Sequence, residues 1–221
     1  MPDGLNYDLW QGPAPRRPYR DNLVHYNWHW FWHWGTGELG NNGVHGLDLA
    51  RWGMDVDYPT RVTSGGGIYY FDDDQETPDS QVLTFEFGDR MITWEGRNWH
   101  HRGFEGEMFG AAFYGDQGTL VMGSTGYKVY DRKDKLVEEN PGRAGDAPHI
   151  ANFLDGIRKG TALSAEIETG YKSTLLCHLG SIAHRTGHTL NCDPKTGHII
   201  DDDQANALWS REYEPGWEPR V

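Results

Sequence analysis

The hydrophobic period changes twice along this chain, and this change constrains the fold more than any other feature of the sequence. Residues 38–54 carry apolar side chains every three to five positions, which is typical of an amphipathic helix. Residues 60–133 then alternate with a period of two, and the helical period returns over 147–160 and 165–187, where Gly187 is a suitable stop. The predicted strands are TRVTSGGGIYYF, SQVLTFEFG, RMITWEGRNW, MFGAAFYGDQ, TLVMGS and YKVYDRK.

The order helix, strands, helices predicts an α+β fold, with an open, mainly antiparallel β-sheet of about six strands and helices packed on one face. A chain of 221 residues can bury one sizeable core, so we expect a single domain overall. Within it, residues 1–34 are expected to form an extended lead-in and an aromatic strand. Residues 35–221 are expected to form the α+β part.

Residues 25–34 read HYNWHWFWHW, with four Trp, three His, one Tyr and one Phe. Tryptophans occupy even positions and His25, His29 and His33 occupy odd ones, which predicts an extended segment. The Trp row is expected in the core and the His row at a cleft or in solvent, so Trp30→Ala should damage folding and His29→Ala should not. Alternatively, one or two of these side chains line a carbohydrate pocket.

Charge and hydropathy exclude several classes of partner. The net charge of -13 repels nucleic acid, and the sequence contains no Lys/Arg block to counter it. The apolar runs are far shorter than the roughly 20 residues that cross a membrane, and the N-terminus resembles no export signal. Cys177 and Cys192 form no disulfide framework. We therefore expect a soluble, cytoplasmic protein, unless an export signal precedes Met1.

Nucleotide-binding motifs are not predicted in this chain. The Gly-x-x-x-x-Gly-Lys-Ser/Thr pattern does not occur, and the glycine-rich TSGGGIYY continues into a strand instead of opening a helix. The acidic runs FDDDQETPD and IIDDDQ lack the spacing of a calcium-binding loop and are predicted to be solvated turns. No cofactor site is therefore expected within these residues.

Three polar residues of the predicted helix 38–54 form the candidate catalytic group. Asn41, His45 and Asp48 follow one another at spacings of four and three, so they lie near one helix face. A carboxylate beside an imidazole can fix its tautomer and favour its charged form, which suits a general acid or base. The alternative is that Asp48 pairs with Arg51 on the helix surface and that His45 has only a structural role.

The loop after the third predicted strand supplies candidate substrate-binding residues. Arg97, His100 and Arg102 in RNWHHR could line the same cleft from the sheet side, together with His29 and His33; the alternative is an ordinary polar loop. A metal site made of His25, His29 and His45, holding Zn or Mn, is a further alternative. It requires a helical 25–34 segment, because residues four apart in a strand are separated by about 13 Å.

The segment GTGELGNNGVHGLDLARWGM resembles the glycine-rich helix that opens the C-terminal domain of the glucose-fructose oxidoreductase, inositol dehydrogenase and rhizopine catabolism (Gfo/Idh/MocA) family. The family pattern maps onto Gly35, Gly37, Asn41, His45 and Asp48. YDLWQGPAP, HYNWHWFW, HIANFLDGIRKG and AEIETGYKSTLLCHLGSIAHRTG also resemble the bacterial branch of the family. This chain departs from the pattern at Asn41, where a carboxylate normally assists the His.

The resemblance implies that a Rossmann domain binds NAD(P) and supplies a Lys from a Glu-Lys-Pro motif. The C-terminal domain then supplies Asp and His and forms oligomers through its open sheet face. Our leading hypothesis is the substrate-binding and assembly domain of a sugar or polyol oxidoreductase, without its own nucleotide-binding domain. One alternative is a stand-alone hydrolase, lyase or epimerase, metal-dependent or cofactor-free, that acts on sugar-like substrates. Another is an oligomerising sugar-binding module.

Overall fold

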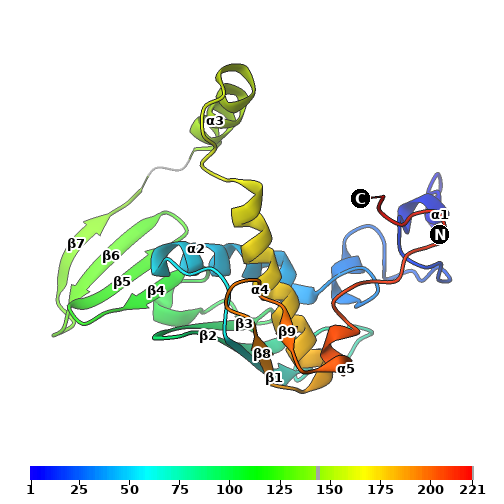
Figure 1. Cartoon of the computed structure of the whole chain (residues 1–221), viewed down its shortest axis with the longest axis horizontal. Coiled ribbons are helices and arrows are strands. Elements are labelled where there is room, and N and C mark those ends of the chain that lie inside the picture. The colour runs from blue at the N-terminus through cyan, green and yellow to red at the C-terminus, as the bar shows by residue number, and fades with distance from the viewer. Residues whose placement is uncertain (143–144, 221) are drawn as a thin grey trace.

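The computed structural model describes residues 1–142 and 145–220. Its strands form two antiparallel sheets, one in the order β3-β2-β1-β8-β9 and one in the order β4-β5-β6-β7 (Figure 1). The strands of the first sheet are β1 (Arg61–Gly67), β2 (Ser80–Phe87), β3 (Arg90–Arg97), β8 (Leu190–Cys192) and β9 (Ile199–Ile200). Those of the second sheet are β4 (Ala111–Tyr114), β5 (Gly118–Gly123), β6 (Gly126–Asp131) and β7 (Leu136–Asn140).

Helices precede, interrupt and follow these strands. The α-helices are α1 (Tyr7–Trp10), α2 (Val44–Met54), α3 (Asp146–Lys159), α4 (Ile167–Thr186) and α5 (Asp203–Asn206). Two 3₁₀-helices, η1 (Asn27–Trp30) and η3 (Phe104–Gly106), and one π-helix, η2 (Leu39–Gly43), complete the described elements. Gly187 ends α4 in the left-handed conformation, as predicted.

The predicted α+β class with mainly antiparallel sheets is confirmed, but the six predicted strands divide between two sheets. The long segment 98–110 between β3 and β4 separates them. The strands that the sequence did not predict are β7, β8 and β9. The strands β8 and β9 contain only three and two residues, which is too short to show a period.

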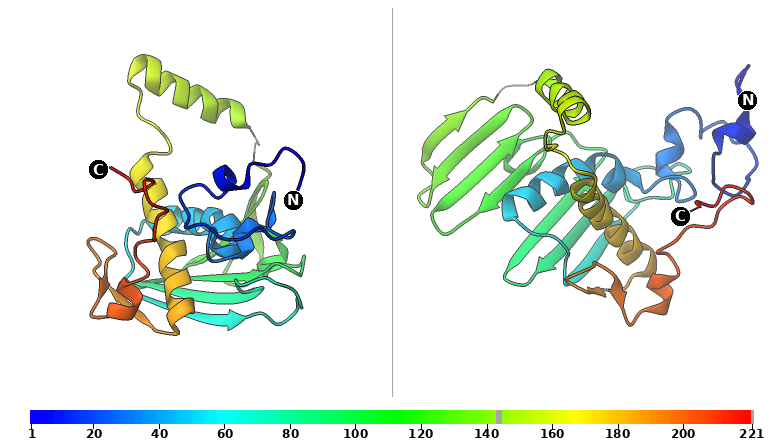
Figure 2. Two further views of the ribbon diagram at one scale, coloured as in Figure 1. Left: turned by 90° about the vertical axis from the view of Figure 1, so that its right-hand side faces the viewer. Right: turned by 45° about the horizontal axis from the view of Figure 1, so that its top comes forward.

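Both α2 and α4 pack on one face of the first sheet (Figure 2, left). Alternate residues of β2 point into this contact, so Leu83 and Phe85 are fully buried while Val82 is 45% exposed on the other face. Gly180 permits the close approach of α4, since a Cβ there would lie 2.7 Å from the Leu83 side chain. Each fully buried Leu or Phe contributes about 1.5–3 kcal/mol, so this layer contains most of the hydrophobic stabilisation.

The N-terminal segment forms a lobe with its own small core. Tyr7, Leu23 and Phe31 are buried in it, and their partly buried apolar neighbours are Leu5, Trp10, Tyr19, Val24, Trp30 and Trp34. The C-terminal tail is tied to this lobe, because the Glu214 backbone N–H donates to the Pro13 carbonyl oxygen at 2.9 Å. The two termini therefore lie on the same side of the molecule (Figure 1).

The predicted strand over 25–34 is wrong. The segment forms η1 and then turns, in which the N–H groups of Phe31 and Trp34 donate to carbonyls three residues earlier. The predicted burial is also wrong in the centre of the run: His29 and Phe31 are 5% and 4% exposed, whereas Trp28 is 41% exposed. Apart from Asn27, both the odd and the even positions of this run are aromatic, so the alternation of residue types gave no strong alternation of polarity to set which positions are buried.

Candidate functional site

The helix with the candidate catalytic group begins with a π-helical turn. The π-helix η2 contains Asn41 and continues directly into α2, whose first turn contains His45. Gly43 allows this junction to press against β3, because a Cβ there would lie 3.1 Å from the Trp94 indole. Single π-helical turns are rare and frequently occur at functional sites. The sequence predicted the helix but not this irregularity.

His45 is exposed at the start of α2, and no hydrogen bond ties its ring to another described residue. Asn41, one turn earlier, is half-buried. The neighbouring Asn42 donates from Nδ2 to Glu38 Oε1 at 2.7 Å, a contact between residues four apart on the helix. Glu38 therefore places a carboxylate near this turn, although Asn41 itself carries none. The Glu38–Asn42 spacing of four is the sequence signal that could have identified it.

Asp48 takes part in a different network from the predicted one. The Ser173 hydroxyl of α4 donates to Asp48 Oδ1 at 2.5 Å, and Arg51 Nε donates to the same Ser173 oxygen at 3.0 Å. Arg51 Nη2 lies 4.0 Å from Asp48 Oδ1, but Arg51 is buried and not a surface partner. Asp48 thus joins α2 to α4, and the structure does not pair it with His45.

The segment 98–110 passes close to the first turn of α2. A Cβ added at Gly46 would lie 3.9 Å from the Gly110 carbonyl oxygen and from the Phe109 ring. His100 and Arg102 lie on this segment, both exposed, and the Arg102 backbone N–H donates to His100 Nδ1 at 3.2 Å. The end of this segment, at Phe109 and Gly110, therefore lies against the helix that carries the candidate catalytic group, whereas His100 and Arg102 make no hydrogen bond to that helix.

Arg97 lies elsewhere. Successive residues of β3 point to opposite faces of the sheet, so Arg97 projects from the face opposite α2, away from Trp94. On that face its Nε lies 3.3 Å from Glu95 Oε1. This ion pair borders an open cleft of about 300 Å³. The cleft is lined by Gly65, Gly66, Tyr69, Ser80, Gln81, Val82, Glu95, Gly96 and Arg97.

The two predicted cleft histidines are engaged in the N-terminal lobe. His29 Nδ1 donates to the Tyr26 carbonyl oxygen at 2.6 Å, and its buried Nε2 has no partner among the described residues. His33 Nε2 donates to the Pro15 carbonyl oxygen at 2.7 Å. Burial lowers the pKa of His33 although the Pro15 hydrogen bond acts in the opposite direction, which favours the neutral ring. Both imidazoles are therefore engaged in hydrogen bonds within the fold and are not available to bind a substrate.

The alternative metal site is not assembled in the structure. Among residues 1–142 and 145–220, no group of three or more His, Cys, Asp or Glu side chains could hold a metal ion. His25 and His45 are exposed, whereas His29 is buried among the rings of Tyr26, Trp28 and Trp30. The set His25, His29 and His45 therefore gives no structural support for Zn or Mn chemistry.

Replacing His29 by alanine should destabilise the protein by about 2 kcal/mol, because the substitution removes a buried ring and its hydrogen bond to Tyr26. His25→Ala is the control: its ring is exposed, and the change should stay within about 0.5 kcal/mol. Urea unfolding followed by tryptophan fluorescence measures both. Equal stability of the two variants would contradict a structural role for His29.

The glycines Gly35, Gly37 and Gly40 have the Gly-x-Gly-x-x-Gly spacing of a dinucleotide-binding turn. In the structure they follow η1 and turns instead of a strand, and every described strand pairing is antiparallel. A Cβ at Gly35 would lie 2.4 Å from the His29 Cα, and one at Gly37 would lie 2.6 Å from Thr77 Oγ1. These two glycines are explained by close packing, and the context is not a nucleotide-binding β-α-β unit.

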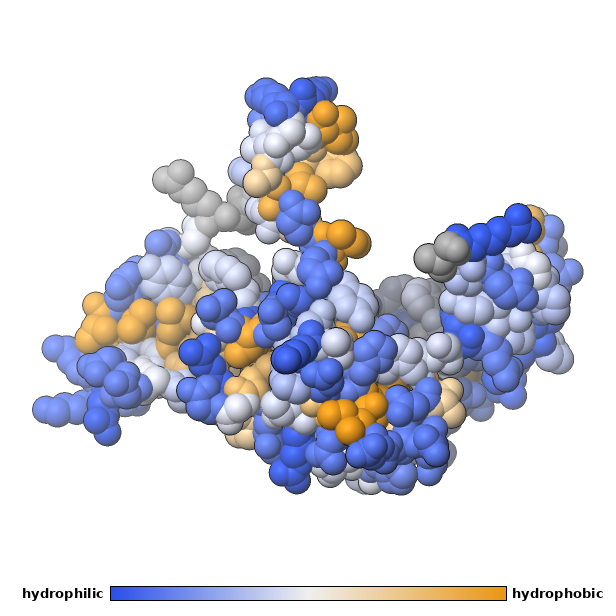
Figure 3. Space-filling view, viewed as in Figure 1, coloured by the Kyte–Doolittle hydropathy of each residue, from blue (hydrophilic) through white to orange (hydrophobic). Residues whose placement is uncertain are grey.

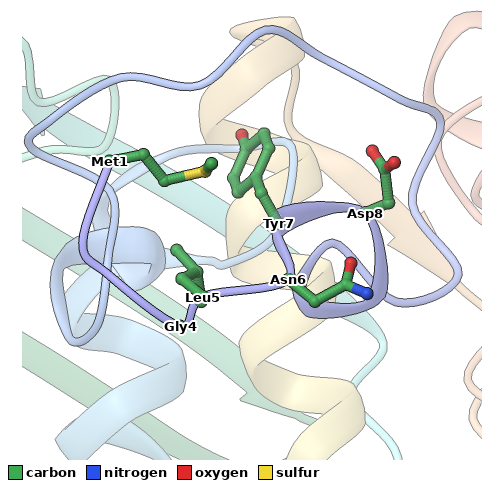
Figure 4. Close-up of a pocket in the computed structure, with 6 residues that line it drawn as sticks. All are labelled: Met1, Gly4, Leu5, Asn6, Tyr7 and Asp8. Atoms are coloured by element: carbon green, nitrogen blue, oxygen red, sulfur yellow. The ribbon is translucent and has the colours of Figure 1, made fainter.

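A hollow of about 610 Å³ lies at the N-terminus and contains none of the predicted site residues (Figure 4). Met1, Gly4, Leu5, Asn6, Tyr7 and Asp8 line it. Its side chains include a single carboxylate and no imidazole or guanidinium, so few polar groups converge there. The junction of η2 and α2, with Phe109 and Gly110 beside it, is therefore the stronger candidate site.

Solved structures with a similar fold are oxidoreductases or are described as such. A protein described as an oxidoreductase from Bacteroides fragilis is 15% identical with a TM-score of 0.55, covering 84% of this chain and 60% of that protein. One from Klebsiella pneumoniae is 13% identical with a TM-score of 0.55, covering 79% and 53%. The WlbA dehydrogenase from Bordetella pertussis, solved with NADH and UDP-GlcNAcA, is 15% identical with a TM-score of 0.50, covering 81% and 52%. At these identities the likeness shows the fold alone.

The chain spans 52 to 60% of the length of these three proteins. No curated protein matches its sequence. Within the described residues, every helix is too short or too polar to span a membrane. The family model of the Gfo/Idh/MocA "oxidoreductase family, C-terminal alpha/beta domain" matches residues 1–218, nearly the whole sequence. The chain therefore belongs to this oxidoreductase family and corresponds to its C-terminal α/β domain.

Proposed function

We propose that this chain is the substrate-binding and assembly domain of an NAD(P)-dependent sugar or polyol oxidoreductase whose nucleotide-binding domain is separate from these residues. The observation that carries the proposal is the π-helical turn with Asn41, followed at once by the exposed His45, in a chain that matches the family's C-terminal domain over 1–218. WlbA, which has the same fold, was solved with NADH and a UDP-linked sugar acid.

The residues of this chain fit the polar half of such a reaction. NAD(P)⁺ bound to the separate domain would supply the oxidising chemistry of such a reaction, the acceptance of a hydride from the carbon that bears the substrate hydroxyl. His45 is accessible and would accept the proton that this hydroxyl loses, so that alcohol becomes carbonyl and the charges balance. Asn41 can orient the hydroxyl but cannot take its proton, and Glu38 is the nearby carboxylate held by Asn42.

Assembly is the second part of the proposal. The face of the first sheet opposite α2 and α4 exposes Val82 and Met91, which are 45% and 58% accessible. Val82 lies on the inner strand β2 and Met91 near the start of the edge strand β3. Exposed apolar side chains on an open sheet face favour contact with another protein surface, and we assign this face to a homo-oligomer. Arg97 and its cleft lie on the same face, so substrate at Arg97 and assembly through this face would compete for the same surface.

His45→Ala should weaken sugar or polyol binding about tenfold, which corresponds to about 1.4 kcal/mol for a lost polar contact, without lowering thermal stability. The probes are myo-inositol, glucose and a UDP-linked sugar acid, titrated by calorimetry against the chain. His149→Ala is the matched control, because His149 is exposed on α3 and away from the candidate site.

Two results would contradict the proposed function. One is that no probe binds the wild-type chain more tightly than millimolar, and the other is that His45→Ala and His149→Ala bind equally well. Micromolar binding of NAD(H) or NADP(H) to the chain by itself would overturn the assignment of the nucleotide site to a separate domain.

A further inference from the structure

The three consecutive glycines at the end of β1 are not all explained by the fold. Gly66 has a φ of 135°, and a Cβ there would lie 2.2 Å from the Ser80 carbonyl oxygen. A Cβ at Gly67 would lie 3.2 Å from Cζ of the Tyr69 ring. Gly65 has no positive φ, and beyond its chain neighbours a Cβ there would meet no described atom within 4 Å. Glycine weakens a strand, and it often marks a place where a ligand or another backbone comes close.

Gly65 borders the open cleft of about 300 Å³ on the sheet face opposite α2. Two rows of three residues cross β1, β2 and β3 on this face: Gly65, Val82 and Glu95, and then Gly67, Ser80 and Arg97. Neighbouring strands are about 4.8 Å apart, so each row spans about 10 Å from its glycine to its charged residue. The hollow therefore lies over the glycines, and the charged side chains stand on its far side. Its volume is at the lower end of the range for ligand pockets, which suits a single ring.

The charged side of the cleft is an ion pair with spare hydrogen-bonding capacity. Arg97 Nε lies 3.3 Å from Glu95 Oε1, and the two side chains are 37% and 39% exposed. The terminal nitrogens of Arg97 and the second oxygen of Glu95 make no hydrogen bond to another described residue. Because the two charges compensate each other, this pair favours a neutral ligand over an ion. A hydroxyl group can accept from the guanidinium and donate to the carboxylate at the same time.

Tyr69 gives the cleft an aromatic wall. Its side chain is 76% exposed, and its ring lies beside Gly67. The Tyr69 backbone N–H donates to the buried Asp79 carboxylate at 2.9 Å, and the next residue, Tyr70, stacks on Trp99 with ring centroids 4.9 Å apart. The backbone that carries the Tyr69 ring is therefore held in place. An exposed aromatic face of this kind suits the C–H side of a sugar ring.

We propose that this cleft is a second ligand site, which binds one ring of a neutral sugar or cyclic polyol. The C–H side of the ring lies over Gly65 and against Tyr69, and its hydroxyls bond to Glu95 and Arg97. Helix α2, which carries His45, packs on the other face of the sheet. The cleft is thus separate from the proposed catalytic site, and its ligand does not depend on the role of His45.

The exposed apolar side chains of α3, at the top of Figure 3, form a different kind of surface. Ile150, Phe153 and Ile157 offer area for contact but no directional hydrogen bonds, so they select no particular small ligand. The cleft is more specific, because an aromatic wall and two opposite charges converge on one hollow.

Gly65→Val tests the site directly on the whole chain. Valine suits a strand, and its Cβ enters open space, so the variant should fold, which circular dichroism checks. Its side chain fills the hollow and should weaken the binding of glucose and myo-inositol to the cleft at least tenfold, measured by calorimetry. Arg97→Gln keeps the cleft open but removes the guanidinium, and it should also weaken binding at least tenfold.

Arg61→Gln is the matched control. Arg61 pairs with Glu86 at 3.3 Å on the same sheet face, and the two residues lie opposite each other on β1 and β2. This ion pair resembles that of Arg97 and Glu95 but does not line the cleft. Arg61→Gln should therefore leave the binding of both probes within about twofold of the wild type.

The same titrations on His45→Ala separate this proposal from the proposed function. Binding in the cleft should persist in His45→Ala and be lost in Gly65→Val, whereas binding that depends on His45 should persist in Gly65→Val. The proposal is overturned if no binding of glucose or myo-inositol is lost in Gly65→Val, or if Arg97→Gln and Arg61→Gln bind equally well. Binding of inorganic phosphate as tight as that of the sugars, and lost in Arg97→Gln, would also overturn it by showing an anion site.

Sedimentation equilibrium accompanies each titration, because the cleft opens on the sheet face that we assign to assembly. The mass of Gly65→Val should equal that of the wild type at the same protein concentration. If Gly65→Val instead lowers the mass and leaves probe binding unchanged, Gly65 accommodates another backbone and not a sugar ring, and the proposal fails.

Discussion

Asp79→Ala should destabilise the protein by about 3–5 kcal/mol, a large fraction of the stability of a typical domain. Asp79 is only 1% exposed, and its Oδ2 accepts hydrogen bonds from three successive backbone N–H groups, those of Tyr69, Tyr70 and Phe71, at 2.7–3.1 Å. Its Oδ1 accepts the Ser80 hydroxyl at 2.8 Å. Alanine leaves all four donors without their acceptor, and partial access of water limits the loss.

The control for this prediction lies six residues earlier in the same acidic run. Asp73 is exposed and accepts one backbone N–H, from Gln75, at 2.8 Å. Asp73→Ala should therefore cost no more than about 1 kcal/mol. Urea unfolding monitored by tryptophan fluorescence gives both free energies of unfolding. If Asp79→Ala costs no more than Asp73→Ala, the carboxylate is not the anchor of this loop.

The contribution of Asp79 should also depend on pH. Burial acts to raise the pKa of this carboxyl, but the hydrogen bonds from Tyr70, Phe71, Ser80 and Tyr69 outweigh it and hold the pKa below its usual value. A carboxyl with a lowered folded-state pKa stabilises the fold above its unfolded pKa, about 3.9, and loses that effect as pH falls through the lower folded value. The stability difference between wild type and Asp79→Asn should thus be constant from pH 5 to 7 and shrink below about pH 4.

Arg51→Ala should destabilise the protein by about 3–5 kcal/mol, because it removes the centre of a buried polar network between α2 and α4. The guanidinium donates to Ser173 Oγ at 3.0 Å and to the carbonyl oxygens of Val56 and Thr169 at 3.1 and 3.3 Å. It also lies 3.5 Å from an Asp57 carboxylate oxygen. Arg51→Lys should recover only part of the loss, since one ammonium cannot reach these divergent acceptors.

Arg61→Ala is the matched control for Arg51. Arg61 pairs with Glu86 at 3.3 Å on the sheet, with its side chain 50% exposed, and loss of such a pair costs at most about 1 kcal/mol. Unfolding in urea compares the two variants directly. Similar free energies for Arg51→Ala and Arg61→Ala would show that the buried network contributes little. In that case the contact between α2 and α4 would depend on apolar packing alone.

The α+β class and the helices over 38–54, 147–160 and 165–187 could be predicted because their hydrophobic period is local information. The candidate helix with Asn41 and His45 was located for the same reason. The partition of the strands into two sheets was not predictable in this way. It depends on where the chain turns after Arg97 and on pairing with β8, which is almost 130 residues away from β1 in sequence.

The roles of individual polar residues were decided by tertiary contacts. Asp79 resembles its solvated neighbours in FDDDQETPD, yet the return of the chain past β1 buries it beneath three N–H groups. Asp48 has the helical spacing to face His45, but its carboxylate instead accepts a hydrogen bond from Ser173, 125 residues later in the sequence.

The aromatic run 25–34 is a clear example of burial that the sequence alone cannot predict. Its composition favours contacts between aromatic rings, and His29 contacts the rings of Tyr26, Trp28 and Trp30 within the run. Its alternation of Trp and His could not determine which row is buried, since both are aromatic and the free-energy difference between the two orientations is set by neighbours distant in sequence. Local period fixes which elements form, whereas burial and hydrogen-bond partners depend on long-range contacts, and these only the tertiary structure supplies.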